Sequence, residues 1–160
     1  MDATAMDEHR WLERFVGEWT WEMEADGEPG QPGHRLTGTE RVRSLGGVWV
    51  VCEGEGAMPD GGQAQTIMTL GFDSSTGRFT GTFVGTMMHH LWLYDGEIDR
   101  EGSVLTLDTE GPGFEDPSKL SRYRDTITFH GDDHRVLASS YQGADGTWHE
   151  FMASHYRRAA

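Results

Sequence analysis

Hydrophobic and polar residues alternate along most of this chain with the period of two that is typical of β-strands. Only residues 7–16 depart from it, because Leu12 and Phe15 recur there at helical spacing before Gly17 ends the segment. The pattern therefore predicts one short N-terminal helix and about ten strands. These strands lie near Glu18–Ala25, Leu36–Leu45, Gly47–Glu55, Ala64–Phe72, Arg78–Gly85, Met87–Tyr94, Val104–Thr109, Arg122–Phe129, Arg135–Gln142 and Thr147–Arg157.

Turn-forming residues separate the expected strands. A Gly- and Pro-rich loop is expected at 26–33, and tight hairpin turns at 73–77, 99–102 and 131–133. The longer connection 111–121 either covers one mouth of a barrel or forms an ordered surface loop. Because short connections favour an up-and-down meander, and closure removes exposed strand edges, we expect an all-β fold with one closed antiparallel barrel.

The expected domain organisation is a single barrel domain. It spans residues 1–160, with the helix at about 7–16 and the barrel at about 18–158. This length suffices for one domain with its own core.

Charge and hydropathy exclude several classes of function. The net charge is −14, and the few Lys and Arg residues form no cluster that could neutralise phosphates. We therefore expect no nucleic-acid partner and no attraction to anionic membranes. The N-terminus lacks the basic and apolar regions of a signal peptide, and no segment reaches the roughly 18 apolar residues of a membrane helix. A cytoplasmic location is expected.

Cys52 is the only cysteine, so an internal disulfide is excluded. It lies in the apolar stretch Val48–Cys52, where a buried, inert thiol is the expected state rather than a reactive nucleophile. The chain also lacks a nucleophile elbow, a phosphate-binding loop and a calcium loop.

Two resemblances sharpen the fold. Gly17-Glu18-Trp19 opens the first expected strand with a G-x-W pattern that resembles the signature of calycin barrels, the lipocalin and fatty-acid-binding superfamily. Other blocks resemble an uncharacterised bacterial family, domain of unknown function 1579, over nearly the whole chain. These blocks are Phe83–Gly96, Leu105–Pro112, Asp116-Pro117 with Tyr123–Asp125, Asp133–Leu137, and Gly146–Met152 with Tyr156–Arg158. The resemblance implies a calycin-like barrel and no established activity.

The calycin resemblance also implies a structural role for the G-x-W tryptophan. In calycins this residue lies inside the barrel base, under a basic residue of the last strand. Here Gly17 and Trp19 would form the signature, with Arg157 or Arg158 as the basic partner. We expect Arg158, because Met152 and Tyr156 share its face of the strand.

Strand alternation places an aromatic and mixed set of side chains on one face of the segment around Met88. A barrel cavity typically has an apolar lining with a few polar groups, which this face matches. The expected ligand is a small apolar or amphipathic molecule in the barrel interior. The candidate lining residues are Trp21, Met88, His90, Trp92, Tyr123 and Glu150. Alternatively, this face packs under the helix or forms a homodimer interface.

Other functions remain open from the residues. His90 and Glu150 would be the acid and base of an isomerase- or hydratase-like enzyme, and no other catalytic residue is predicted. The eight histidines show no zinc-site spacing, so no metal is predicted. Some calycin-like barrels hold heme, and His90 or His155 would then be the axial ligand. Their first strand, however, carries alternating glycines that Thr20–Glu24 lacks, so no cofactor is predicted. A filled barrel used for structure or self-association is the third alternative.

Overall fold

The computed structural model describes residues 3–25 and 34–159, and the loop expected at 26–33 lies outside them. It opens with helix α1 (Asp7–Leu12) and the 3-10 turn η1 (Glu13–Phe15). No helix of these residues is long and apolar enough to cross a membrane. The strands are β1 (Gly17–Ala25), β2 (His34–Leu45), β3 (Trp49–Ala57), β4 (Gln63–Asp73), β5 (Arg78–Gly85), β6 (Trp92–Ile98), β7 (Val104–Pro112), β8 (Leu120–Phe129), β9 (His134–Gln142) and β10 (Trp148–Arg158).

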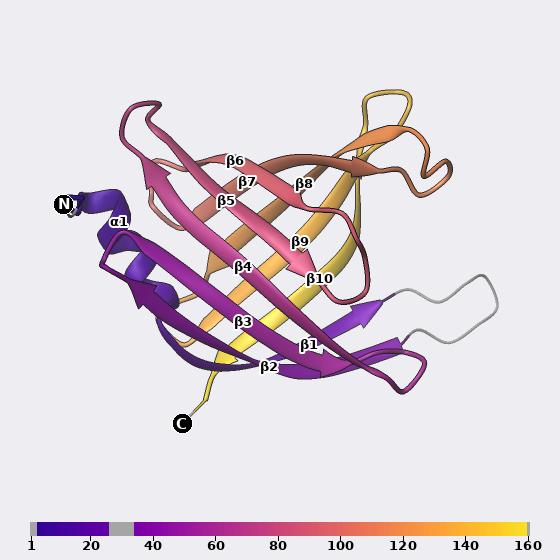
Figure 1. Ribbon diagram of the computed structural model, residues 1–160, viewed down its shortest axis with the longest axis horizontal. Coiled ribbons are helices and arrows are strands. Elements are labelled where there is room, and N and C mark those ends of the chain that lie inside the picture. Colours follow the sequence, from indigo (N-terminus) through magenta and orange to yellow (C-terminus); the bar gives the residue numbers. More distant parts are fainter. Residues whose placement is uncertain (1–2, 26–33, 160) are drawn as a thin grey trace.

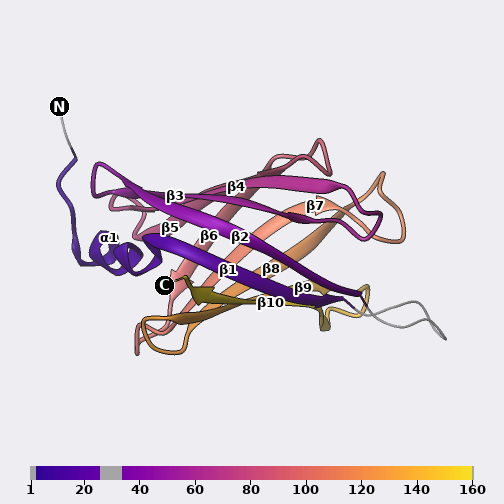
Figure 2. The ribbon, with the colours of Figure 1, turned by 90° about the horizontal axis from the view of Figure 1, so that it is seen from below.

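The strands form a closed antiparallel barrel in which each strand neighbours the next along the chain (Figures 1 and 2). Pairing of β1 with β10 closes it, for example through Trp21 and Tyr156. Closure satisfies the backbone groups that an open sheet would leave at its edges. The predicted all-β fold with a closed barrel and a short N-terminal helix is confirmed.

One expected strand differs from the structure. The segment predicted as Met87–Tyr94 becomes a strand only at Trp92, and β6 then continues to Ile98. A turn precedes it, in which the Met88 amide donates to the Gly85 carbonyl. The apolar residues before Trp92 therefore belong to a loop at the barrel rim. The rule that alternate residues of a strand point to opposite faces does not apply to them.

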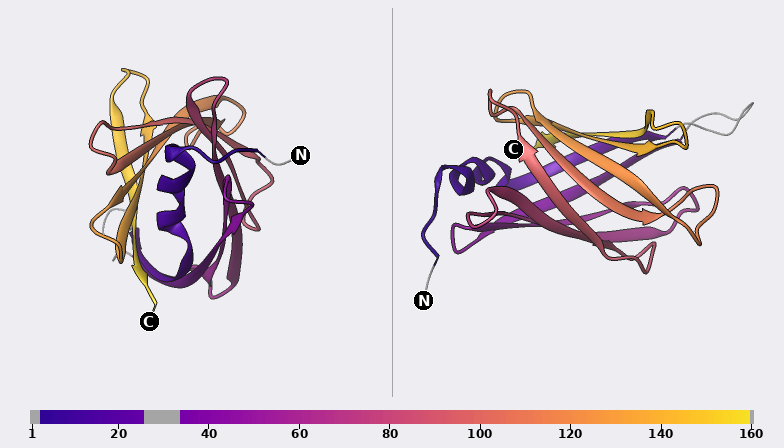
Figure 3. Two further views of the ribbon diagram at one scale, coloured as in Figure 1. Left: turned by 90° about the vertical axis from the view of Figure 1, so that its left-hand side faces the viewer. Right: turned by 90° about the horizontal axis from the view of Figure 1, so that it is seen from above.

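Helix α1 and turn η1 close one end of the barrel, here called the base, as the left panel of Figure 3 shows. Leu12 and Phe15 are fully buried there. The Trp11 indole donates to the Gly102 carbonyl at 2.6 Å, and His9 Nε2 lies 3.0 Å from the Phe72 carbonyl oxygen. Burial of the apolar face of this short helix supplies stability that its own hydrogen bonds would not.

Trp19 forms the centre of the base. Its ring is buried, and its indole nitrogen donates to the Phe15 carbonyl at 2.8 Å. The Arg158 guanidinium lies 4.3 Å from the ring centroid and donates to the carbonyls of Val16 and Arg14. One side chain of β10 therefore satisfies the carbonyls that follow the helix while it covers the tryptophan.

A buried ion pair lies above Trp19 inside the barrel. Arg135 of β9 pairs with Glu40 of β2, and both side chains are less than a tenth exposed. The guanidinium also lies 4.8 Å from the Trp19 ring centroid and 4.0 Å from that of Tyr156. Cys52 is buried nearby, and burial raises the pKa of its thiol far above the ordinary value, which keeps the thiol protonated.

The base is expected to carry much of the barrel's stability. Trp19→Ala removes a fully buried aromatic ring and should lower the free energy of unfolding by about 3–5 kcal/mol. Guanidinium-induced unfolding, followed by circular dichroism, measures the loss. Trp49→Ala is the matched control, because Trp49 is 40% exposed, and it should cost much less. Equal losses in the two variants would contradict this role of Trp19.

Candidate functional site

The barrel wall separates between β6 and β7. These strands pair only where Asp95–Ile98 faces Leu105–Asp108. Beyond that point, Trp92–Tyr94 pairs with β5 alone, and Thr109–Pro112 pairs with β8 alone. We call this gap the β6–β7 opening. It leaves backbone groups of both strands without their usual partner in the sheet.

Two side chains from the β6 side cross the β6–β7 opening. His90 Nε2 lies 3.0 Å from the Glu110 carbonyl oxygen and so caps one of the backbone groups that β7 leaves unpaired. The Trp92 ring faces the interior and packs on Gly111, where a Cβ atom would overlap it. The His90 and Trp92 rings meet edge to face at 4.5 Å. These contacts replace the missing strand pairing with side-chain contacts, which can separate without breaking the sheet.

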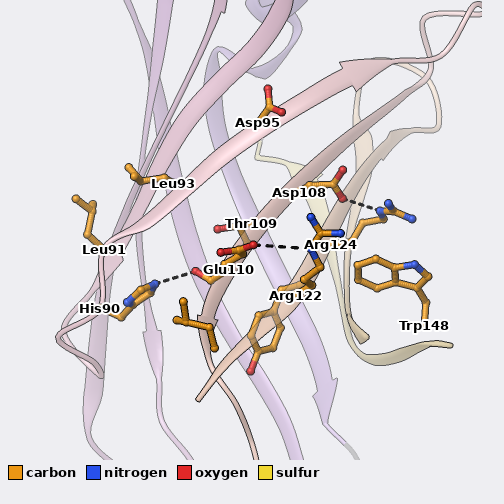
Figure 4. A pocket seen from close by; sticks show the side chains of 12 residues that line it. His90, Leu91, Leu93, Asp95, Asp108, Thr109, Glu110, Arg122, Arg124 and Trp148 are labelled. Carbon is orange, nitrogen blue, oxygen red and sulfur yellow. Dashed lines mark hydrogen bonds and ion pairs between the residues drawn. The ribbon is translucent and has the colours of Figure 1, made fainter. Parts of the chain in front are cut away.

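A pocket of about 480 Å³ lies at the β6–β7 opening (Figure 4). Its outer part is formed by side chains that project from the wall, such as Asp108 and Arg124. Its inner part is formed by Thr109 and Tyr123, which face the barrel interior. Leu93 and Leu120 are largely exposed at its rim. The pocket therefore connects the outer surface to inward-facing residues.

The charged side chains of this pocket are already paired with one another or with close neighbours. Arg124 Nε lies 2.8 Å from Asp108, and its guanidinium lies over the Trp148 ring at 4.3 Å. The other pairs are Arg122 with Glu110 at 3.7 Å and Arg78 with Asp95 at 3.1 Å. The outer lining thus presents opposite charges that largely compensate.

Aromatic side chains gather inside the barrel next to the pocket, at the end opposite the base. The Tyr123 ring lies 5.1 Å from Trp92, 5.8 Å from Phe114 and 6.3 Å from Phe151, all edge to face. Phe114 belongs to the connection between β7 and β8, and it also contacts Tyr141. This connection therefore reaches over the mouth of the barrel, which is one of its two expected roles. Such clusters are suited to flat, apolar ligands.

A carboxyl group lies inside the barrel below this cluster. The Tyr94 hydroxyl donates to Asp125 Oδ2 at 2.6 Å. Burial raises the pKa of Asp125 above its ordinary value, and hydrogen bonds from Tyr94 and Ser139 oppose the rise. Within residues 3–25 and 34–159, no Lys or Arg forms an ion pair with Asp125. The interior therefore favours the uncharged form of this acid.

The structure brings four of the residues expected at a site together. His90, Trp92 and Tyr123 are in ring contact, and the Trp92 indole lies 2.8 Å from the Met88 sulfur. Trp21 also faces the interior, but its ring packs on Gly38 of β2 and Gly56 of β3, on the side of the barrel away from the β6–β7 opening. Of the candidates named from the sequence, His90 and Tyr123 line the pocket itself, and the charged outer lining was not predicted. Thr109 of the inner lining was also missed, although its inward parity on the expected strand was an available signal.

Glu150 lies apart from this group. It was expected to line the interior, but a bulge between Glu150 and Met152 reverses the parity of β10, and Glu150 does not share the inward face of Met152. Glu150 is exposed and lines a groove on the outer surface with Glu22 and Glu24. His90 and Glu150 therefore do not meet as an acid–base pair in this structure.

The histidines are dispersed or on the outside. His155 faces outward, and its Nδ1 atom lies 3.0 Å from His134 Nε2. His149 of β10 pairs with the inward-facing Tyr141, but it is exposed near the end of the strand, where its ring lies 5.2 Å from that of Tyr141. Among the histidine side chains that the structure describes, an axial heme ligand inside the barrel would therefore have to be His149 or a residue of the loop that carries His90. No group of three or more His, Cys, Asp or Glu residues in the described ranges is arranged to hold a metal ion.

Comparisons with known proteins agree with the barrel. Residues 4–158 match the model of a family described as "Protein of unknown function (DUF1579)". None of the curated proteins compared with the chain matches it. Rv2717c from M. tuberculosis is similar in structure, with 11% identity, a TM-score of 0.66, and coverage of 98% of this chain and 100% of that one. A de novo designed fluorescence-activating β-barrel is 12% identical, with a TM-score of 0.51 and coverage of 96% and 99%. At these identities the likeness concerns the fold.

The position of Asp125 predicts a specific pH dependence. Because folding raises its pKa, Asp125 contributes most favourably below its ordinary pKa of 3.8, and this contribution is lost as the pH rises through the folded-state pKa. Asp125→Asn removes the titration while it keeps an acceptor for Tyr94. The stability of this variant relative to the wild type should therefore increase from pH 4 to pH 7, measured by urea unfolding. The control variant Asp95→Asn, which loses the exposed partner of Arg78, should show no such increase.

Proposed function

We propose that this chain, which belongs to the DUF1579 family of proteins of unknown function, binds a small, mainly apolar molecule in its barrel. The observation that supports this most is the pocket at the β6–β7 opening, whose lining runs from the outer surface to the inward-facing Thr109 and Tyr123. A volume of about 480 Å³ lies within the usual range of small-molecule sites.

The interior beyond the pocket favours an apolar ligand. Tyr123 is shared by the pocket and the aromatic cluster, so a ligand that displaces or slides past its ring meets Trp92 and Phe151. Met88 can follow such a movement, because its side chain is flexible and its sulfur contacts the Trp92 indole. Trp21 would form the far wall of the same space.

The β6–β7 opening gives this ligand a route that does not break the barrel. Its closing contacts are one hydrogen bond from His90 and the packing of Trp92 on Gly111. The base offers no comparable route, because Trp19 and Arg158 fill it. The likeness to a designed fluorescence-activating β-barrel supports the proposal by analogy of fold alone.

The proposal is tested with Prodan, an uncharged naphthalene dye whose emission shifts to the blue when it leaves water. We expect saturable binding to the wild-type protein. Trp92→Ala should weaken the binding about 5–10-fold, because an aromatic contact of roughly 1 kcal/mol is lost.

Trp49→Ala is the matched control, because Trp49 lies on the outer wall near Gly71, and it should leave the affinity within about twofold. Thermal melting of both variants checks that they are folded. Lack of saturable binding by the wild type, or equal weakening by both variants, would refute a site in the barrel.

A further inference from the structure

Thr109 has a buried hydroxyl group without a hydrogen-bond partner. The residue is 9% exposed, and its Oγ1 atom contacts no donor or acceptor of residues 3–25 and 34–159. A buried polar group in this state is unfavourable, and natural proteins keep few of them. Thr109 lies in the inner lining of the pocket at the β6–β7 opening. Its hydroxyl is closed to solvent in this arrangement, so a ligand in that pocket reaches it when the side chains across the β6–β7 opening move apart.

The position of Thr109 follows from the separation of the strands. It is the first residue of β7 beyond the last pair with β6, Asp95 with Asp108. Its neighbour on the other side is Tyr123 of β8, and both side chains face inward. The hydroxyl thus lies on the inner side of the wall, between the charged outer part of the pocket and the aromatic cluster.

The surrounding charges indicate what kind of group binds there. Each carboxylate and each guanidinium of the pocket lining already has an opposite charge beside it, as described above for Asp95, Asp108 and Glu110. An ionic ligand would have to compete with these pairs, and an anion would also meet the net charge of −14. An uncharged group that hydrogen-bonds has no such cost.

On these grounds we propose that the ligand is an uncharged, mainly apolar molecule with one hydrogen-bonding group, such as a carbonyl or hydroxyl, which binds the Thr109 hydroxyl. Its apolar body lies against Tyr123 and the aromatic cluster, and Leu93 and Leu120 flank the entrance. This inference rests on the proposed function, since it names the ligand class of the same pocket.

Four naphthalene probes of similar shape differ in their charge and in their capacity to form a hydrogen bond. 2-Acetylnaphthalene offers one acceptor, 2-ethylnaphthalene offers none, 2-naphthoate is an anion and 2-naphthylmethylammonium is a cation. Isothermal titration calorimetry at neutral pH gives each dissociation constant. We expect the acetyl compound to bind about 3–10-fold more tightly than the ethyl compound, which corresponds to one hydrogen bond. Both ions should bind at least about tenfold more weakly than the acetyl compound.

Thr109→Val removes the hydroxyl and keeps the shape of the side chain. We expect this variant to lose the preference for the acetyl compound while it binds the ethyl compound as well as the wild type does. Its melting temperature without ligand should be unchanged or higher, because an unpaired buried hydroxyl is replaced by a methyl group. Thr106→Val is the matched control, since Thr106 lies on the same strand and faces outward, and it should keep the preference.

The outcomes distinguish this inference from the proposed function. If the acetyl preference persists in Thr109→Val, or if either ion binds more tightly than the acetyl compound, the assignment of Thr109 and of an uncharged ligand is overturned. Binding of the probes in the barrel would still stand in that case. If none of the four probes binds the wild-type protein, both proposals are overturned together.

Discussion

The buried ion pair between Glu40 and Arg135 is the interaction on which the rest of the barrel depends. It joins β2 to β9 across the inside of the barrel and spans the two strands, β1 and β10, that close it. The Arg135 guanidinium covers Trp19 and Tyr156, which project from those strands. A buried pair of this kind persists only where water is excluded and the geometry is fixed, and loss of one partner typically costs about 3–5 kcal/mol. Helix α1, Trp19 and Arg158 exclude water from the ion pair on the side of the base.

Because the base must be filled to shield this pair, space for a ligand is left at the other end. The two halves of the interior differ accordingly. The base half holds aliphatic and aromatic side chains that are fully buried, such as Leu70 and Leu107. The opposite half holds rings in edge-to-face contact, among which Phe114 is largely exposed. A fully buried half at one end and a partly exposed cluster of rings at the other is an arrangement that suits a binding barrel.

The sequence was sufficient to predict the class of fold, because alternation is a local property of each strand. The inward position of Trp19 was implied by the calycin resemblance, and those of Trp21 and Tyr123 followed from alternation. The same rule failed where a strand is irregular. Glu150 precedes a bulge in β10, and the loop before Trp92 only imitates alternation. The bulge has no turn residue that would indicate it, and Gly85 at the turn before β6 is a residue type that also occurs inside these strands. The pairing with neighbouring strands is therefore what reveals both irregularities.

The β6–β7 opening could not have been predicted for a related reason. It arises because the two strands diverge: Trp92–Tyr94 of β6 pairs with β5 alone, and the facing half of β7 pairs with β8 alone. Each strand taken by itself has an ordinary sequence pattern. Trp92 and His90 were recognised from their chemistry, whereas their role depends on Gly111 and the Glu110 carbonyl about twenty residues away. Since Gly111 lacks a side chain, the Trp92 ring can lie against the wall at the gap. The missing pairing between β6 and β7 thus explains both the irregular wall and the positions of His90, Trp92 and Gly111 at the site.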